Sequence, residues 1–228
     1  MPRSLNFSLP DFEIVRFPDR YFTSVLSYNK LVLTDHFYRT FLKYKYILLY
    51  QLDALVFSDQ LMEWCERDFD YVGAPWLKNA NSPEQGFSNV GNGGFSLRKV
   101  ETALAVLDSR EVVIDASEYW TEFQATHTRF SQILNLYKKY LKRFSYFSNV
   151  RWYVRHPHDM EDIFWANIAP KIHPRFKIAP VAEALKFSFE SAPRYCFEQN
   201  NFQLPFGCHS WEKYDRGFWE PYLLRDES

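Results

Sequence analysis

One carboxylate stands directly after a long apolar run in this sequence. Residues 46–52 read YILLYQL, and Asp53 follows them. Such a run predicts a strand buried on both faces, and open α/β sheets bind ligands beyond the carboxyl ends of their strands. A carboxylate in that place is a hard oxygen donor suited to Mg²⁺ or Mn²⁺. Asp53 is therefore a candidate site residue, although a strand-end Asp is also common in ordinary turns.

A glycine-rich segment and a pair of acids add to this chemistry. Residues 91–96 read GNGGFS, and glycines let the backbone come close to a ligand. Paired glycines also mark plain turns and bulges. Glu161 and Asp162 open a predicted helix, where carboxylates suit the positive end of the dipole. Asp53 and the glycine segment together indicate a metal-assisted site for a phosphate or a sugar nucleotide.

Two further histidines are dense enough for zinc but lack partners. His156 and His158 lie in the segment RHPHD, and no further Cys or His completes a convincing ligand set. We expect a surface or acceptor-binding loop there.

The elements that must position these residues follow from the hydropathy pattern. The first half predicts the order strand, helix, strand, helix, strand, at residues 13–17, 22–44, 46–57, 60–67 and 71–76. This order predicts an α/β fold with a mainly parallel central sheet flanked by helices. The rest predicts an exposed loop, three helices and a loop-like tail, at 78–89, 100–107, 119–147, 161–166 and 205–228.

Composition limits the class of protein. A chain of 228 residues is long enough for one core, so we expect a single domain over 1–228. The 27 Lys and Arg residues nearly balance 28 Asp and Glu, which argues against nucleic-acid binding. Three cysteines without a C-x-x-C pair favour a reducing compartment. No secretory signal or membrane-spanning run is evident, so we expect a cytoplasmic protein that at most contacts a membrane peripherally.

Five segments in order resemble GT-A-type glycosyltransferases. The resemblance is closest to a bacterial and fungal family catalogued as a domain of unknown function, and it covers most of the chain. It implies a single GT-A-like, Rossmann-like domain. The segments are YQLDALVF (50–57), YVGAPW (71–76), GNGGFSLR (91–98), EDIFW (161–165) and PFGCH (205–209).

The resemblance implies a divalent metal, Mn²⁺ or Mg²⁺. GT-A enzymes commonly carry an Asp-x-Asp motif whose last Asp binds the metal that bridges the nucleotide diphosphate. The corresponding triplet here ends in Asp53 and begins with Gln51, which can bind a ribose or a metal-bound water but brings no charge. His209 takes the place of a second metal ligand from a C-terminal loop.

The resemblance also places the sugar and the general base. The segment with Gly93 and Gly94 is expected to border the donor sugar and the acceptor, and Asn92 and Ser96 are candidate partners for sugar hydroxyls. In inverting enzymes a carboxylate in a comparable Glu-Asp segment deprotonates the acceptor hydroxyl.

For that base Asp162 is our first choice and Glu161 our second. Trp165 gives the same segment an aromatic side chain suited to a sugar. The acids also have the plainer interpretation that they stabilise a helix N-terminus.

These assignments predict transfer of a sugar from a nucleotide-diphosphate donor to a hydroxyl of a glycan or glycolipid acceptor, with inversion. The sequence departs from the family at its start, because only residues 13–17 precede the first helix and the usual first β-α unit is shortened or absent. Two other hypotheses remain. One is a non-catalytic glycan- or nucleotide-binding domain on a degenerate scaffold, and the other is a metal-dependent phosphohydrolase.

Overall fold

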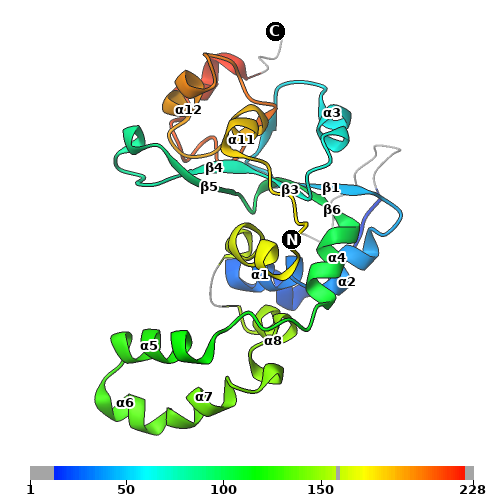
Figure 1. Cartoon of the computed structure of the whole chain (residues 1–228). Coiled ribbons are helices and arrows are strands. Elements are labelled where there is room, and N and C mark those ends of the chain that lie inside the picture. The colour runs from blue at the N-terminus through cyan, green and yellow to red at the C-terminus, as the bar shows by residue number, and fades with distance from the viewer. Residues whose placement is uncertain (1–12, 158–159, 224–228) are drawn as a thin grey trace.

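A small antiparallel sheet lies between two layers of helices (Figure 1). The structure is a computed structural model and describes residues 13–157 and 160–223. Strand β6 (Phe95–Lys99) is central and pairs antiparallel with β1 (Tyr46–Tyr50) and with β3 (Tyr71–Val72). β1 and β3 therefore run in the same direction on either side of β6.

Two smaller sheets complete the β-structure of the described residues. Strand β8 (Gly207–Cys208) pairs antiparallel with β2 (Leu55–Val56) and parallel with β7 (Ser188–Phe189). Strands β4 (Ala74–Leu77) and β5 (Phe87–Gly91) form an antiparallel hairpin.

The expected mainly parallel central sheet is therefore wrong. The single strand expected over 46–57 is wrong: it is divided into β1 and β2, and β1 is not buried on both faces, since Tyr50 is 50% exposed. The strand expected over 71–76 is confirmed by β3 and β4. β6 lies between β1 and β3 in the opposite direction. The reason is that hydropathy marks a strand without marking the direction of its neighbour. The chain turns back between β4 and β5, so β5 and then β6 run antiparallel to β4 and β3, and no helical crossover comes between them.

The lower helical layer in Figure 1 covers one face of this sheet. It contains α1 (Val25–Val32), α2 (Asp35–Thr40), α4 (Val100–Asp108) and α8 (Val150–Arg155). The helix expected over 100–107 is confirmed by α4. The single helix expected over 22–44 is wrong, because Thr34 caps a new helix: its side chain accepts a hydrogen bond from the Phe37 backbone N–H. Residues 13–17 form no strand.

The upper layer holds α3 (Leu61–Glu66), α11 (Val181–Phe187) and α12 (Pro193–Gln199), and the helix expected at 60–67 is confirmed by α3 (Figure 1). The tail contributes α13 (Arg216–Trp219) and a 3₁₀ turn at Glu220–Tyr222, so it is not only loop. Further 3₁₀ turns lie at Asp19–Phe22, Pro83–Gln85 and Ser145–Phe147.

The expected long helix over 119–147 is divided. α5 (Ala116–Thr126), α6 (Arg129–Leu134) and α7 (Leu136–Leu141) form an arm below the rest of the molecule (Figure 1). The helix expected from Glu161 starts as α9 (Glu161–Ile163), passes through a π-helical stretch at Phe164–Ile168 and ends as α10 (Ala169–Ile172).

The alternation of side chains along β6 divides the core in two. Phe95 and Leu97 face the upper layer, where they pack near Trp64 of α3. Ser96 and Arg98 point to the other face, toward Tyr38 of α2. This alternation carries a guanidinium into the lower core. No described helix is long and apolar enough to cross a bilayer.

Candidate functional site

The short sheet β2-β8-β7 brings three distant side chains to one place. Phe189 pairs with Cys208 in parallel strands, so the next residues along the two strands, Glu190 and His209, lie side by side. Asp53 stands two residues before Leu55, which pairs with Cys208 from the other side. The site therefore depends on strands of only two residues each, which no local sequence signal marks.

His209 is the centre of this group. Its Nδ1 lies 2.9 Å from Glu190 Oε1, and its Nε2 lies 3.3 Å from Asp53 Oδ1 and 3.2 Å from Gln51 Oε1. The His209 side chain is 11% exposed, whereas that of Asp53 is 48% exposed. Ser210 Oγ donates to Asp53 Oδ2 over 3.4 Å. His209 and Ser210 thus contact Asp53 on its protein side, and the rest of its carboxylate is open to solvent.

The donor set favours a cation. A carboxylate only accepts, so the contact with Glu190 places a proton on His209 Nδ1. Nε2 lies against the oxygens of Asp53 and Gln51, so either a second proton on the ring or a metal ion joins these three atoms. A carboxylate behind the imidazole is also the usual support of a metal-binding His.

The protein alone offers an incomplete coordination sphere. No group of three or more His, Cys, Asp or Glu side chains in the described part of the chain is arranged to hold a metal ion. Asp53 and His209, with the neutral oxygen of Gln51, fit a divalent ion whose remaining ligands are phosphate oxygens and water.

The glycine segment separates the His209 group from the two acids. A Cβ at Gly94 would overlap His209 Nε2, and one at Gly93 would lie 2.7 Å from Glu161 Oε1. The Gly94 carbonyl also accepts a hydrogen bond from the Gln51 N–H over 2.9 Å. These close approaches require glycine, so the segment is a spacer that brings β1, β8 and α9 together.

Asp162 is the better placed of the two acids for proton transfer. Burial, together with the nearby charges of Glu161 and Glu190, raises its pKa to about 6, and Arg98 only partly opposes this. Glu190, which contacts His209, is thus one of the charges that raise the pKa of Asp162. A carboxyl with such a pKa is ionised at neutral pH and is a stronger base than an ordinary Asp.

Glu161 has a different environment. Its Oε1 accepts a hydrogen bond from Arg98 over 2.7 Å, and both side chains are 1% exposed. Arg98 also donates to Ser96 Oγ and to the Tyr38 hydroxyl. Burial alone would lower the pKa of Arg98. Glu161, Tyr38 and Tyr71 outweigh the effect of burial, so the pKa of Arg98 is raised. Glu161 is therefore one half of a structural ion pair, and its place argues against the base role.

Three expected ligand-binding side chains lie inside the protein. Trp165 is buried and packs on Tyr38 with ring centroids 5.6 Å apart, so its ring belongs to the core. Ser96 is buried and its hydroxyl is engaged by Arg98. Asn92 has a φ of 148°, and its Oδ1 accepts from the Gly94 and Phe95 N–H groups. Asn92 thereby shapes the glycine turn, and the burial of these three side chains argues against direct sugar contacts.

Some neighbours of the candidate site carry no sequence signal that would have selected them. Glu190 contacts His209 Nδ1, and the Gln51 side chain opposes the rise that burial causes in the pKa of Tyr28 of α1. Neither stands in a recognisable motif, and only the pairing of β7 with β8 brings Glu190 to the site. His158 lies outside the described residues, and His156 is exposed with its Nδ1 2.9 Å from the Trp152 carbonyl.

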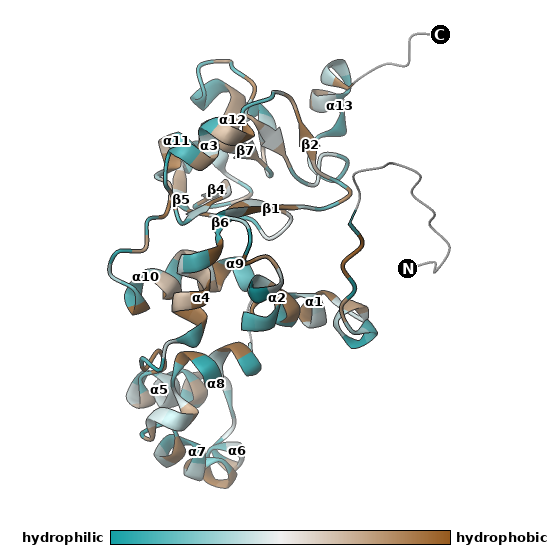
Figure 2. Ribbon diagram, turned by 90° about the vertical axis from the view of Figure 1, so that its right-hand side faces the viewer, coloured by the Kyte–Doolittle hydropathy of each residue, from teal (hydrophilic) through white to brown (hydrophobic). Residues whose placement is uncertain are grey.

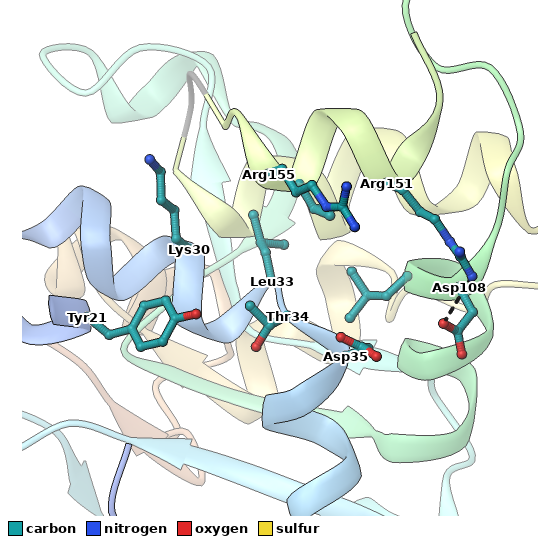
Figure 3. A pocket seen from close by; sticks show the side chains of 10 residues that line it. Tyr21, Lys30, Leu33, Thr34, Asp35, Asp108, Arg151 and Arg155 are labelled. Carbon is teal, nitrogen blue, oxygen red and sulfur yellow. Dashed lines mark ion pairs between the residues drawn. The ribbon is translucent and has the colours of Figure 1, made fainter. Parts of the chain in front are cut away.

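A well-formed hollow lies elsewhere. It measures about 350 Å³ and is lined by opposite charges, including Lys30, Arg151 and Arg155 against Asp35 and Asp108 (Figure 3). None of its lining residues belongs to the His209 group. The candidate site is a partly exposed surface around Asp53, and it does not coincide with this hollow.

Comparison with known proteins assigns the chain to a family. A family described as a protein of unknown function (DUF5672) matches residues 11–209. The chain belongs to the DUF5672 family. The match ends at His209, so the family segment of this DUF5672 member includes every residue of the candidate site named from the sequence. No curated protein and no solved structure gives a significant match.

Proposed function

We propose that this chain transfers a sugar from a nucleotide-diphosphate donor to a hydroxyl of a glycan or glycolipid acceptor. The observation that carries the proposal is the arrangement of two units on either side of Gly93 and Gly94. One unit is the partly exposed Asp53 with His209, and the other is Asp162, whose pKa burial raises to about 6.

Each unit has one task. Asp53, His209 and Gln51 would hold a divalent ion such as Mn²⁺ or Mg²⁺, which supplies Lewis-acid stabilisation to the departing diphosphate when bound. Glu190 fixes the His209 ring and keeps its Nε2 directed at Asp53. The exposed edge of Asp53 leaves room for phosphate oxygens.

Asp162 accepts the proton of the attacking hydroxyl. A general base is most efficient when its pKa lies near the working pH, and the raised pKa of Asp162 meets this condition. A base on the acceptor side and a diphosphate on the donor side describe a single displacement, which inverts the anomeric carbon. Gly93 and Gly94 lie between the two units and pack closely against Glu161 and His209.

A second function has a specific observation in its favour. Gln51 brings no charge where the resembling enzymes have an Asp, and the protein supplies only two charged or imidazole ligands at the site. A nucleotide- or glycan-binding domain without catalysis would show the same geometry.

The test separates the two. A panel of nucleotide sugars is screened by thermal stabilisation with and without Mn²⁺, because a ligand of the folded state raises the melting temperature. Each compound that stabilises the protein is then tested for donor hydrolysis and transfer. The matched variants are Asp53→Ala and Asp59→Ala, the second an exposed Asp in the loop before α3.

We expect Asp53→Ala to abolish metal-dependent binding and transfer and Asp59→Ala to leave both unchanged. Binding without turnover, equal in the presence and absence of Mn²⁺, would favour the binding domain. If Asp53→Ala transferred the sugar as fast as the wild type, Asp53 would not be a metal ligand and that part of the proposal would fall.

A further inference from the structure

The arm formed by α5, α6 and α7 exposes large hydrophobic side chains that helices of water-soluble proteins normally bury. α6 and α7 are six residues each, and neither contains a buried residue. The arm lies at the end of the molecule away from the sheets (Figure 1), and strongly hydrophobic residues alternate with polar ones along it (Figure 2). Its stability therefore does not come from a core of its own.

The exposed apolar side chains of the arm are large. Seven of them, on α6, α7 and the turn that follows, are between 52% and 74% exposed. Aliphatic, phenyl and phenol groups are mixed, a combination that suits the boundary between headgroups and acyl chains. They are Phe130, Ile133, Leu134, Tyr137, Tyr140, Phe144 and Tyr146.

The charge of the same region is strongly one-sided. From residue 123 to residue 157 the sequence contains seven Lys and Arg and no Asp or Glu, although the whole chain has 27 basic and 28 acidic residues. Arg129 and Arg143 are exposed. Residues 123–157, which include α6, α7 and the turn that follows, therefore carry a local positive field on a molecule of formal charge −1, whereas the acids of the arm, Glu118 and Glu122, lie on α5.

Lysine side chains also contact aromatic rings within the arm and at its junction with α8. Lys138 Nζ lies 5.9 Å from the centroid of the Phe123 ring of α5, and Lys142 Nζ lies 3.0 Å from that of the Trp152 ring of α8. These cation–π contacts run from α7 to α5 and α8. They leave the apolar side chains of α6 unpartnered and hold the arm in one arrangement.

A hollow at the base of the arm fits a phosphate. It measures about 650 Å³, and its lining includes Arg110, Arg151 and Arg155 with the rings of Tyr146 and Trp152 but no carboxylate. Arg151 and Arg155 project from α8, as Figure 3 shows from the neighbouring hollow. Arginine binds phosphate oxygens in a bidentate manner.

We propose that this arm docks on the surface of a bilayer that contains anionic phospholipids. Its basic side chains would contact the headgroup phosphates, and the side chains of α6 and α7 would enter the headgroup boundary. A second copy of the chain that docks through the same α6–α7 surface fits less well, because residues 123–157 contain only basic charges and two such surfaces repel. A nucleic acid offers phosphate and bases but no apolar partner for Ile133 and Leu134. The surface is separate from the residues of the proposed function.

The primary test is vesicle flotation with the full chain. Vesicles of phosphatidylcholine alone are compared with vesicles of phosphatidylcholine and phosphatidylglycerol in equal parts. We expect flotation with the anionic vesicles only, and its loss in high salt, because exposed charges are screened.

Two pairs of variants separate charge from apolar contact. Arg129→Gln/Arg143→Gln removes two charges from the arm, and its control Lys171→Gln/Arg175→Gln removes two exposed charges beside α10. Phe130→Ser/Ile133→Ser removes apolar groups from α6, and its control is Phe22→Ser/Met62→Ser, also exposed. Each basic residue near an anionic surface contributes about fivefold in binding, so the arm charge variant should bind roughly 25-fold more weakly.

Other outcomes would overturn the proposal. These are equal flotation with neutral and anionic vesicles, no flotation with either, or equal losses in the arm and control variants. Binding of a single-stranded RNA that the arm variants abolish, without flotation, would assign the surface to nucleic acid. A concentration-dependent dimer that Phe130→Ser/Ile133→Ser dissociates, without flotation, would assign it to a second copy.

Discussion

The ionised form of Asp162 destabilises the folded protein, and the proposed role of Asp162 as a base accounts for this cost. Burial raises the pKa of its carboxyl to about 6, with Glu161 and Glu190 adding to the shift. The folded state therefore holds this proton more tightly than the unfolded state. Stability falls as pH rises from about 4 to about 6 and stays lower above that range. Functional groups are commonly held under such strain.

Replacing this carboxyl should raise stability and remove activity together. At pH 8 we expect Asp162→Asn to raise the free energy of unfolding by roughly 1–3 kcal/mol, because the buried charge is gone. Transfer should fall by at least ~10²-fold, as for loss of a general base. Wild-type kcat/KM should rise with pH around a midpoint near 6, the pKa of this carboxyl.

The measurements are urea unfolding at two pH values and a pH profile of transfer. At pH 4 the variant and the wild type should have nearly equal stability, which serves as the internal control. A gain that is the same at pH 4 and pH 8, or full activity in the variant, would contradict the role of Asp162.

At the scale of elements, the glycine segment between β5 and β6 decides whether the site forms. The segment passes so close to His209 that Gly94 has no room for a side chain. Its Asn92 holds the turn by accepting two backbone N–H groups. The strands β7 and β8 then fix Glu190 and His209 in register. The site is thus built by turns and two-residue strands.

A methyl group at Gly94 should disable the site without unfolding the protein. In Gly94→Ala the new Cβ overlaps His209 Nε2, so the ring must rotate away from Asp53 and Gln51. We expect loss of metal-dependent nucleotide binding and a destabilisation of roughly 1–3 kcal/mol. Calorimetry and circular dichroism measure the two effects.

Gly217→Ala is the matched control for this variant, because its nearest atom, Asp215 Oδ1, would be 3.9 Å from the new Cβ. It should bind and fold as the wild type does. Unchanged nucleotide binding in Gly94→Ala would show that His209 does not take part.

At the scale of the whole molecule, one buried ion pair joins the layers. Arg98 of the central sheet meets Glu161 of α9 and the Tyr38 hydroxyl of α2. Breaking one partner of such a pair leaves an uncompensated charge in the core, whereas removing both restores neutrality.

Arg98→Met should therefore destabilise the whole protein by about 3–5 kcal/mol. The double variant Arg98→Met/Glu161→Met should be less destabilised than the sum of the single variants, because neither charge then remains buried. Urea unfolding of the set measures this coupling. Additive losses would show that the pair itself contributes nothing.

Part of this architecture could be predicted from local signals. The helices α3 and α4 and the strands near residues 46–50 and 71–77 were expected, since each is marked by its own residues. The division of residues 22–44 at Thr34 was missed, because a capping Thr inside an apolar pattern is a weak signal. The parallel sheet was wrong, since strand direction is a long-range property.

The sequence by itself determined which functional groups are present. They are Asp53 after an apolar run, a glycine segment, an acidic pair and His209 near the C-terminal end. Only the tertiary structure decided which of these meet. It turned Trp165 and Ser96 into the core, engaged Glu161 with Arg98, left Asp162 near Glu190, and added Glu190 to His209. The physical reason is that side-chain identity is local, whereas burial and pairing depend on segments that are separated in the chain, by 63 residues for Arg98 and Glu161 and by 158 for Gln51 and His209.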